Sequence, residues 1–328
     1  MVIKSTFSVI IPTFNREAFL LDAVRSAVNA SPENTEIIVV NDGSEFSENV
    51  KSALDILNIS VLKTEGGIGA GGARNQGAEH ATGQWLLFLD DDDLIAFSYW
   101  KSLSEFLLKG PEEHHRSYGF CQTTILNNRE KMHRIAGKKA ISVSYVLEES
   151  NLLRPKLVGL SCGFWLSTTL FREVGGFDGQ LRVNEDTDLC LSLIACGGKC
   201  YVSSFNGAII YLGLRVRNIS QSVTKACNAA DRASYFKRII DKHTKLLDTD
   251  KAANAWIWKR YLKMAARAKD RTAIANLAAN KNLALLTKLF LAVYWTGSFF
   301  VAIVKYSVKP CHTQRMAENI KSKWNGPS

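Results

Sequence analysis

Residues 85–93 read WLLFLDDDD, so five apolar residues run directly into four aspartates. An apolar run of this length, followed by a polar turn, is typical of a strand buried on both faces of a sheet. The carboxylates then lie at its carboxyl end, which is where open α/β sheets bind ligands. Four adjacent acids repel one another, whereas a hard cation such as Mg²⁺ is held by carboxylate oxygens. Residues 90–93 therefore indicate either a metal site or a solvated acidic turn after a core strand.

The chain before this stretch alternates between strand and helix patterns. Residues 7–12 (FSVIIP) and 36–40 (EIIVV) are mostly apolar, which is typical of buried strands. Residues 17–30 carry apolar side chains at helical spacing, and residues 50–57 and 59–62 indicate a second helix and a third, short strand. This βαβα order predicts a parallel sheet with right-handed crossovers.

Residues 65–77 read EGGIGAGGARNQG, which we interpret as a glycine-rich loop that leads into a helix over residues 73–80. Glycines permit backbone conformations and close approaches to a ligand that other residues resist. The segment lacks the Gly-Lys-Ser/Thr of a P-loop and comes too late in the chain for a dinucleotide fingerprint. We expect Arg74 to pair either with a diphosphate or with the acidic cluster of residues 90–93.

Three segments after the acidic stretch have clear patterns. Residues 94–108 predict a helix, and residues 159–166 predict another strand. Residues 184–193, NEDTDLCLSL, begin like a helix with acids in its first turn. A carboxylate held there suits the role of a general base, but acids also favour that position simply because of the helix dipole.

Charge is distributed unevenly along the chain, whose formal net charge is +10. Residues 1–215 hold 20 Lys and Arg against 25 Asp and Glu, whereas residues 216–328 hold 21 against 6. The asymmetry indicates that the C-terminal part meets a polyanion such as an anionic membrane, a nucleic acid or an acidic glycan. A basic helical surface that is merely solvated explains the same charges. No recognisable nucleic-acid-binding motif accompanies them, so we expect no nucleic-acid partner.

The C-terminal part shows only helical patterns, with amphipathic spacing over residues 231–247 and 252–268. Residues 289–304 are 16 residues without a charge, bracketed by Lys288 and Lys305. At about 1.5 Å per residue this segment is shorter than a bilayer core of roughly 30 Å. An interfacial or re-entrant helix on an anionic membrane, or a helix buried in the fold or in an oligomer, would each explain it.

Charge and periodicity both change near residues 215–225, where we place a domain boundary. An α/β domain over residues 1–220 is then followed by a basic helical region over residues 221–328. The seven cysteines show no paired framework, which favours reduced thiols and a cytoplasmic protein.

Six short motifs occur in a recognisable order, each at a predicted strand end or turn. They are residues 8–16 (SVIIPTFNR), 39–44 (VVNDGS), 73–77 (ARNQG), 88–93 (FLDDDD), 175–178 (GGFD) and 185–186 (ED). In this order they resemble the motifs of family 2 glycosyltransferases, whose GT-A fold is a Rossmann-like fold of nucleotide-diphospho-sugar transferases. The resemblance covers roughly residues 5–225, and its specificity lies in the shared order, because each motif alone is weak.

The resemblance implies an inverting transfer of a sugar from a nucleotide-sugar, usually a UDP-sugar, to an acceptor hydroxyl. Asp90 and Asp92 match the DxD pair that holds a divalent metal, Mg²⁺ or Mn²⁺, with Asp92 as the more direct ligand. Asp186 matches the catalytic base, and Glu185 precedes it. Donor and nucleotide binding are assigned to Pro12, Thr13, Asn15, Arg16, Asp42, Arg74, Asp90 and Asp91.

Two departures from the family pattern refine these expectations. Many relatives carry a metal-binding histidine in a segment like residues 214–220, where this chain has Arg217 or Asn218. An arginine cannot bind a metal but could bind the diphosphate. A Gln-x-x-Arg-Trp motif, usual in polymerising relatives, does not follow Asp186. We therefore expect the addition of one or a few sugars.

The expected acceptor is a glycan or a lipid-linked glycan of surface polysaccharide, lipopolysaccharide or other glycoconjugate synthesis. The enzyme would lie peripherally on the cytoplasmic face of the inner membrane, with its donor half at about residues 1–110 and its acceptor half at about 111–220. The alternative is a GT-A-like module that binds a glycan or an anionic surface without turnover. Asp90, Asp92 and Asp186 argue against that alternative, since a binding module has no need of all three.

Overall fold

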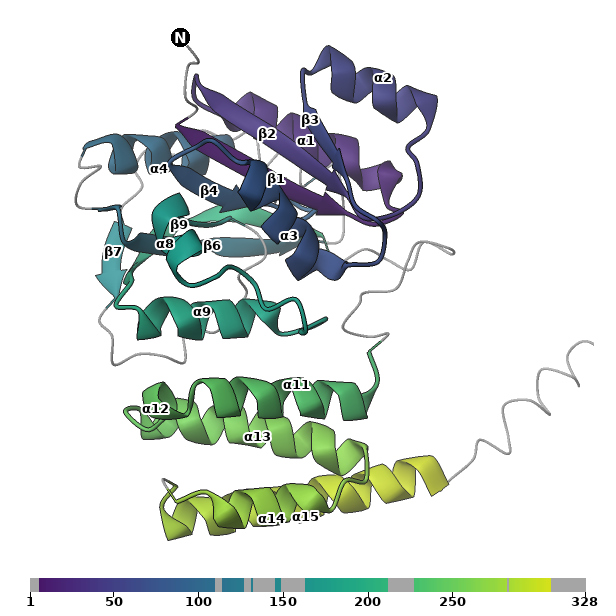
Figure 1. Cartoon of the computed structure of the whole chain (residues 1–328), viewed down its shortest axis with the longest axis vertical. Coiled ribbons are helices and arrows are strands. Elements are labelled where there is room, and N and C mark those ends of the chain that lie inside the picture. The colour runs from purple at the N-terminus through teal and green to yellow at the C-terminus, as the bar shows by residue number, and fades with distance from the viewer. Residues whose placement is uncertain are drawn as a thin grey trace, which may run out of the picture. The chain divides into compact units, whose positions relative to one another are not determined.

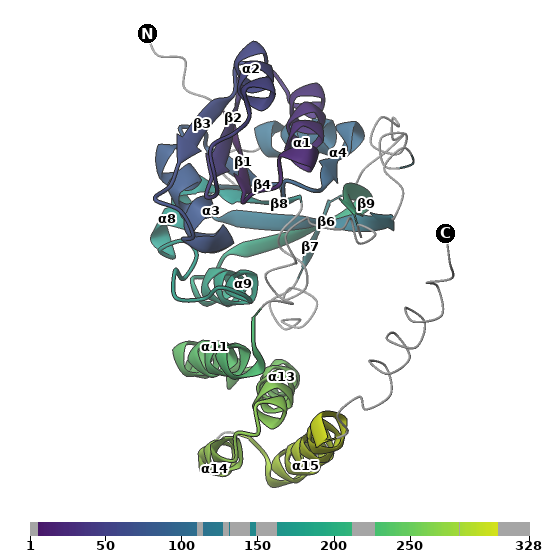
Figure 2. The same ribbon diagram turned by 90° about the vertical axis from the view of Figure 1, so that its right-hand side faces the viewer.

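The computed structural model describes residues 6–109, 114–126, 131, 145–148, 163–211, 227–281 and 283–307 of the 328-residue chain. The chain divides into two compact units, Met1–Cys227 and Asn228–Ser328. The first is an α/β unit, and the described part of the second consists of helices (Figures 1 and 2).

The first unit is built on a mixed sheet with the strand order β3-β2-β1-β4-β8-β6-β9-β5, and β7 pairs with β9. Its strands are β1 (Phe7–Thr13), β2 (Thr35–Asn41), β3 (Ser60–Lys63), β4 (Trp85–Phe88), β5 (Leu94–Ile95), β6 (Ser117–Leu126), β7 (Tyr145–Glu148), β8 (Phe164–Ser167) and β9 (Lys199–Tyr211).

The parallel part of the sheet comprises the first four strands. Strand β1 lies between β2 and β4 and is parallel to both, and β3 continues beside β2. Every residue of β4 is buried, as its apolar run predicted. The parallel pairing predicted for the first three strands is confirmed. The whole sheet is mixed, because β8 is antiparallel to β4 and β6, and β5 and β7 are antiparallel to β9. The carboxyl ends of β1, β2 and β4 point the same way, so the motifs that follow them lie at one edge.

Two helices of the first unit, α3 and α4, begin at other residues than the sequence predicted. Helix α3 begins at Gly69 and not at residue 73, because the Asp42 carboxylate accepts hydrogen bonds from the N–H groups of Ile68 and Gly69. Residues 94 and 95, predicted as helix, pair with β9 instead. The helices are α1 (Glu17–Ala30), α2 (Glu48–Ile56), α3 (Gly69–His80), α4 (Phe97–Lys109), α8 (Thr168–Glu173) and α9 (Glu185–Ala195).

The predicted strand at residues 159–166 falls partly outside the described residues, which resume at Gly163; from there β8 occupies Phe164–Ser167. Strands β6 and β9 were not predicted. They pair with each other in parallel, with register shifts between Phe120 and Thr123.

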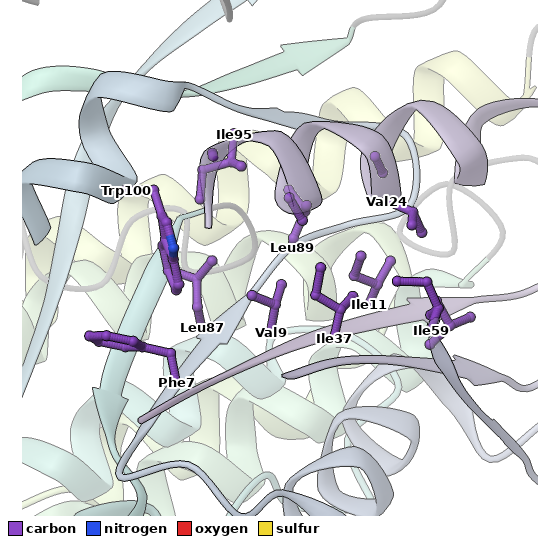
Figure 3. Packing of buried hydrophobic residues seen from close by; sticks show 14 of the residues in the cluster. Phe7, Val9, Ile11, Val24, Ile37, Ile59, Leu87, Leu89, Ile95 and Trp100 are labelled. Atoms are coloured by element: carbon purple, nitrogen blue, oxygen red, sulfur yellow. The ribbon is translucent and has the colours of Figure 1, made fainter. Parts of the chain in front are cut away.

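A core of buried apolar side chains fixes the strands that lead to the acidic turn (Figure 3). Phe7, Val9 and Ile11 alternate along β1 and therefore point to one face of the sheet. Leu87 of β4 lies beside them, and Trp100 of α4 meets the Phe7 ring edge-on at a centroid distance of 5.4 Å. Fully burying such a side chain stabilises the fold by about 1.5–3 kcal/mol.

A glycine lets α3 pack directly on the sheet. A Cβ atom at Gly77 would lie 2.6 Å from Ile10 Cγ2 and 3.1 Å from Val40 Cγ2, and both of these side chains are buried. We expect Gly77→Ala to lower the free energy of unfolding by about 1–3 kcal/mol, the cost of overpacking a core, although alanine is the better helix former. Gly297→Ala is the matched control, because Gly297 is also helical and a Cβ there would meet no atom within 4 Å. If urea denaturation showed that Gly77→Ala and Gly297→Ala lower the free energy of unfolding equally, this account would be contradicted.

The described secondary structure of the second unit consists of helices. Its helices are α11 (Ala229–Lys242), α12 (Thr244–Leu247), α13 (Lys251–Arg267), α14 (Thr272–Ala279) and α15 (Leu285–Ser307). Helix α13 packs against α11 and α15, and α14 packs against α13 and α15. None of the helices in the described part of the chain is long and apolar enough to cross a membrane.

Side-chain caps mark the starts of two helices of the second unit, α11 and α13. The Asn228 side chain accepts a hydrogen bond from the N–H of Asp231 at 2.8 Å, and the Asp250 carboxylate accepts two from the first turn of α13. The predicted helix over residues 231–247 is interrupted at His243, which separates α11 from α12. Helix α14 was not predicted.

Candidate active site

The polar residues after β1, β2 and β4 come together because the three strands pair in parallel register. Thr13 at the end of β1 is paired with Asn41 at the end of β2, and the N–H of Leu89 donates to the carbonyl of Ile10. The chain then enters the acidic turn, residues 90–93, which is closed by a hydrogen bond from the N–H of Asp93 to the carbonyl of Asp90 at 3.2 Å.

Three aspartates of the acidic turn converge. Asp90, Asp92 and Asp93 each offer a carboxylate oxygen, and these atoms all lie within 4.8 Å of one another. Oxygen donors at this spacing suit a hard divalent cation. Asp90 and Asp92 were assigned to a metal from the sequence, but Asp93, which is buried, was not.

Asp91 has different surroundings from its neighbours. It is fully buried and accepts a hydrogen bond from the Thr13 hydroxyl at 2.6 Å. The Arg16 guanidinium forms an ion pair with both Asp91 oxygens and another with Asp92 at 2.6 Å. Burial raises the pKa of the Asp91 carboxyl to about 7 despite the neighbouring Arg16. Asp91 therefore ties the turn after β1 to the acidic turn.

Arg74 connects the acidic turn to α9. Its guanidinium is buried and donates to Asp90 at 2.7 Å and to Glu185 at 3.1 Å. It also lies 5.5 Å from the centre of the Phe177 ring. Of the two pairings considered for Arg74 from the sequence, the one with the acidic cluster is therefore present, and it joins side chains 111 positions apart in the chain.

The Glu185–Asp186 pair opens α9, after Asn184 in the left-handed region at φ 66°. Carboxylates in a first helical turn are stabilised by the helix dipole. The Asp186 carboxylate is half-buried and accepts a hydrogen bond from the N–H of Thr187 at 2.7 Å. Burial raises the pKa of the Glu185 carboxyl to about 7, although Arg74 lies beside it.

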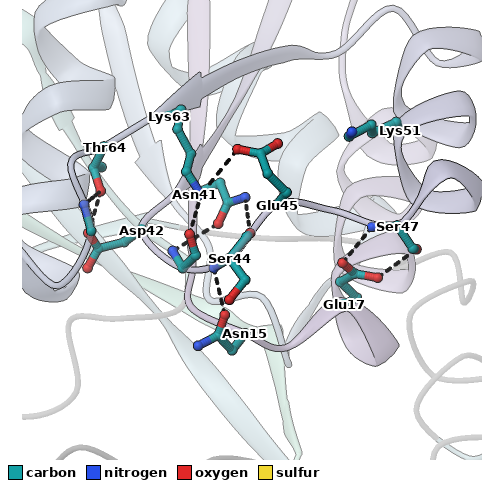
Figure 4. A network of polar contacts seen from close by, with 12 residues as sticks. Asn15, Glu17, Asn41, Asp42, Ser44, Glu45, Ser47, Lys51, Lys63 and Thr64 are labelled. Carbon is teal, nitrogen blue, oxygen red and sulfur yellow. Dashed lines mark hydrogen bonds and ion pairs between the residues drawn. The ribbon is translucent and has the colours of Figure 1, made fainter.

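Asp42 and Asn15 hold the loops around the site in place (Figure 4). The buried Asp42 carboxylate accepts hydrogen bonds from the Thr64 hydroxyl and from two N–H groups at the start of α3. Asn15, at φ 55°, accepts a hydrogen bond from the N–H of Ser44 at 2.8 Å. Pro12 is buried within β1. These contacts connect the turns after β1 and β2 with the glycine-rich start of α3.

Asn75 links two of the motifs, ARNQG and GGFD. Its side-chain amide donates to the carbonyl of Phe177 and accepts from the N–H of the same residue, both at 2.8 Å. Gly176, at φ 69°, approaches so closely that a Cβ there would lie 2.6 Å from Asn75 Oδ1. The ARNQG motif thus binds the backbone of the GGFD motif. Of the site residues assigned from the sequence, Arg217 lies outside the described residues.

The sequence model of glycosyl transferase family 2 matches residues 8–175, about half of the chain. The chain belongs to this family. The match includes the turn after β1, the acidic turn and α3, whose contacts make up most of the site.

Curated relatives of this glycosyltransferase family 2 chain include an uncharacterized glycosyltransferase of Haemophilus influenzae, 28% identical over 57% of this chain and 61% of the relative. The GalNAc(5)-diNAcBac-PP-undecaprenol beta-1,3-glucosyltransferase of Campylobacter jejuni is 34% identical over 35% of this chain and 37% of its own length. The minor teichoic acid biosynthesis protein GgaB of Bacillus subtilis is 29% identical over 39% of this chain and 17% of its own. The chain thus spans less than two thirds of each of these relatives.

Solved structures confirm the GT-A fold. Residues 1–349 of S. aureus TarS in complex with UDP-GlcNAc align with a TM-score of 0.60 and 19% identity over 90% of this chain and 81% of TarS 1–349. The complex of the same fragment with UDP aligns with a TM-score of 0.55 and 17% identity over 92% of this chain and 91% of the fragment. At this identity the likeness concerns the fold alone.

Proposed function

We propose that this protein is an inverting glycosyltransferase that moves a sugar from a nucleotide-sugar, a UDP-sugar, to an acceptor hydroxyl. The observation that carries the proposal is that Asp90 of the acidic turn and Glu185, the neighbour of Asp186, both pair with one buried cation, Arg74. Residues from three separate segments thereby build one site at the carboxyl ends of the parallel strands. The names of the family and of its relatives support transfer of a sugar.

The acidic turn fits a divalent metal, Mg²⁺ or Mn²⁺, by the chemistry and spacing of its oxygens. Asp92 and Asp90 would hold it, with Asp93 as a third donor. Such an ion neutralises the negative charge that builds on the departing diphosphate. Arg16 and Arg74 hold the carboxylates in their positions.

The loops around the acidic turn would bind the donor. Pro12, Thr13, Asn15 and Arg16 would line the nucleotide site from the β1 side, and Asp91 would keep that turn in place through Thr13 and Arg16. Asp42 would act from the β2 side, at the base or ribose, while holding the start of α3. We assign the donor half to about residues 1–110, the acceptor half to about 111–220, and residues 221–328 to a separate basic region.

Asp186 would act as the general base. A carboxylate at this helix terminus remains partly open to water, and its hydrogen bond from Thr187 orients it. It would take the proton from the acceptor hydroxyl as that oxygen attacks the anomeric carbon. A single displacement by the acceptor breaks the bond to the diphosphate and inverts the anomeric centre. No carboxylate nucleophile is needed, in contrast to retaining glycoside hydrolases.

The acceptor would be a glycan or a lipid-linked glycan of surface polysaccharide or lipopolysaccharide synthesis. Two relatives support this class, since one is named for teichoic acid biosynthesis and another for an undecaprenol-linked glycan. An enzyme with such an acceptor would work peripherally at the cytoplasmic face of the inner membrane. We infer that it adds one or a few sugars, with Arg217 available to bind the diphosphate.

Nucleotide binding provides the first test. We expect UDP with Mn²⁺ or Mg²⁺ to raise the melting temperature of the full chain, because a ligand at a hundredfold excess over its Kd stabilises the folded state by about 2.7 kcal/mol. EDTA should remove most of the shift, and so should Asp92→Asn. Asp55→Asn, a change of an exposed acid on α2, is the matched control and should keep it.

Three outcomes of this screen would alter the proposal. A larger shift with GDP, CDP or dTDP would replace UDP as the donor nucleotide. A shift that EDTA leaves unchanged would contradict the metal site and assign the diphosphate to arginines. No shift with any nucleotide, together with no release of nucleoside diphosphate from any sugar nucleotide, would favour a non-catalytic module that binds a glycan or an anionic surface.

A further inference from the structure

Helix α15 presents a wide apolar face to solvent. Seven large apolar side chains on it are between 54% and 81% exposed, and at 3.6 residues per turn they fall within one side of the helix. Thr296 and Gly297 lie on the same side and are also exposed, so this side carries no charge. We call this set the α15 face: Leu285, Leu286, Leu289, Phe290, Val293, Thr296, Gly297, Phe300 and Val301.

The opposite side of α15 is held by the rest of its unit. Leu291 and Trp295 are buried, and the helix packs against α13 and α14. The Trp295 ring stacks on that of Phe299 at a centroid distance of 4.7 Å. The helix therefore has a fixed rotation, with one side on protein and the α15 face outward. Exposed apolar patches of this extent mark sites of interaction with a protein or a membrane.

Cationic side chains lie at both borders of the α15 face. Lys259 Nζ lies 4.7 Å from the centre of the Tyr294 ring and 5.9 Å from that of Phe290, at one border. The Arg271 guanidinium lies 5.9 Å from the centre of the Phe299 ring, at the other. Lys259 is followed along α13 by the exposed Lys263 and, four residues further on, Arg267.

The charge of the whole unit has the same sign. Residues 228–328 contain 19 Lys and Arg against 6 Asp and Glu. Interfaces between proteins are depleted of lysine. An uncharged apolar face bordered by lysine and arginine instead matches the surface of an anionic bilayer, where negatively charged headgroups cover apolar acyl chains. Each basic residue near such a surface adds to its attraction for anionic lipid.

We propose that the α15 face is a peripheral docking surface for an anionic lipid bilayer. The helix lies along the membrane plane, its apolar side chains enter the boundary between headgroups and acyl chains, and Lys259 and Arg271 contact lipid phosphates. This inference deepens the proposed function, whose lipid-linked acceptor supplies its setting, but it rests on surface residues that take no part in sugar transfer.

Vesicle binding by the full chain tests the proposal. We expect co-sedimentation with vesicles of phosphatidylcholine that contain phosphatidylglycerol, and much weaker binding to phosphatidylcholine alone. The triple change Leu286→Ser, Val293→Ser and Phe300→Ser should lower the partition coefficient at least tenfold. The matched control carries the same changes at exposed apolar residues of the first unit, Ile56→Ser, Leu108→Ser and Ile125→Ser, and should bind as the unchanged protein does. Lys259→Glu with Lys263→Glu should abolish the preference for anionic vesicles.

Several results would overturn the proposal. One is that the full chain does not bind anionic vesicles, and another is that the two triple variants lose vesicle binding equally. A third is that the protein does not bind vesicles but forms an oligomer in sedimentation velocity, and that the α15 triple change dissociates this oligomer. The last result would assign the face to a second copy of this chain. The nucleotide-induced rise in melting temperature, measured on the same variants, separates this inference from the proposed function. Vesicle binding without any nucleotide-induced shift and without release of nucleoside diphosphate would leave the docking surface standing and contradict the proposed sugar transfer.

Discussion

Asp186→Asn is expected to reduce sugar transfer by about 10²–10⁴-fold, the usual contribution of a general base. The asparagine side chain keeps the shape of the aspartate but cannot take a proton from the acceptor. It can still accept the hydrogen bond from the N–H of Thr187, so the start of α9 should be unchanged. The measurement is the release of nucleoside diphosphate from the donor, in the presence of an acceptor glycan.

This change should leave donor binding intact, because Asp186 belongs to α9 and not to the acidic turn. The UDP-induced rise in melting temperature should therefore equal that of the unchanged protein, and Asp55→Asn should alter neither quantity. Transfer by the Asp186 variant at the original rate would remove Asp186 from the mechanism. A parallel loss of nucleotide binding would assign it to the donor site instead.

Arg74→Met is expected to lower the free energy of unfolding of the first unit by about 3 kcal/mol. Removing one partner of a buried ion pair leaves the other charge uncompensated, at a cost of about 3–5 kcal/mol. We expect the lower end of that range, because Asp90 and Glu185 retain 22% and 14% side-chain exposure and water screens them in part. Urea denaturation followed by hydrogen exchange of the β1 and β4 amides would monitor the first unit by itself.

A second ion pair of the same unit provides the matched control. Arg116 pairs with Glu173, but the two side chains are 34% and 40% exposed. Exposed pairs contribute little to stability, so Arg116→Met should lower the free energy of unfolding far less than Arg74→Met. Glu185→Gln should make the Arg74 change less costly, since the two residues interact directly. Equal costs for the two arginines, or strictly additive effects of Arg74 and Glu185, would contradict the role of Arg74 as the link between the acidic turn and α9.

The centre of the fold could be predicted because its signals are local. The run over residues 85–89 is apolar because β4 is buried on both sides, and the acids follow where the strand ends. The same holds for β1, β2 and α1, whose patterns lie within a few residues of the positions that the structure gives them. The order of the six motifs also placed Asp90, Asp92 and Asp186 in one expected site.

The elements that could not be predicted depend on contacts between distant parts of the chain. Helix α3 begins inside the glycine-rich segment because Asp42, 26 positions before Ile68, accepts its first N–H groups. Leu94 and Ile95 continue a helical pattern but form β5 because β9 offers a strand edge. The burial pattern of β6 changes along its length, from buried to mixed, so neither alternation nor a continuous apolar run marks it.

Pairings between side chains could not be predicted for the same reason, because they also join distant parts of the chain. The sequence showed that Arg74 could meet either phosphate or carboxylate, and only the packing of α3 against β1 places it between Asp90 and Glu185. The partnership of Arg16 with Asp91 joins residues 75 positions apart and had no local signal.

The measurement that tests the central claim most directly is a crystal structure of the full chain with UDP and Mn²⁺, with data collected at a wavelength where manganese scatters anomalously. We expect one strong anomalous peak among the carboxylates of Asp90, Asp92 and Asp93, with the diphosphate against it and the uridine beside the turns after β1 and β2. A nucleotide bound elsewhere, or a diphosphate held at this place without any metal peak, would contradict the account.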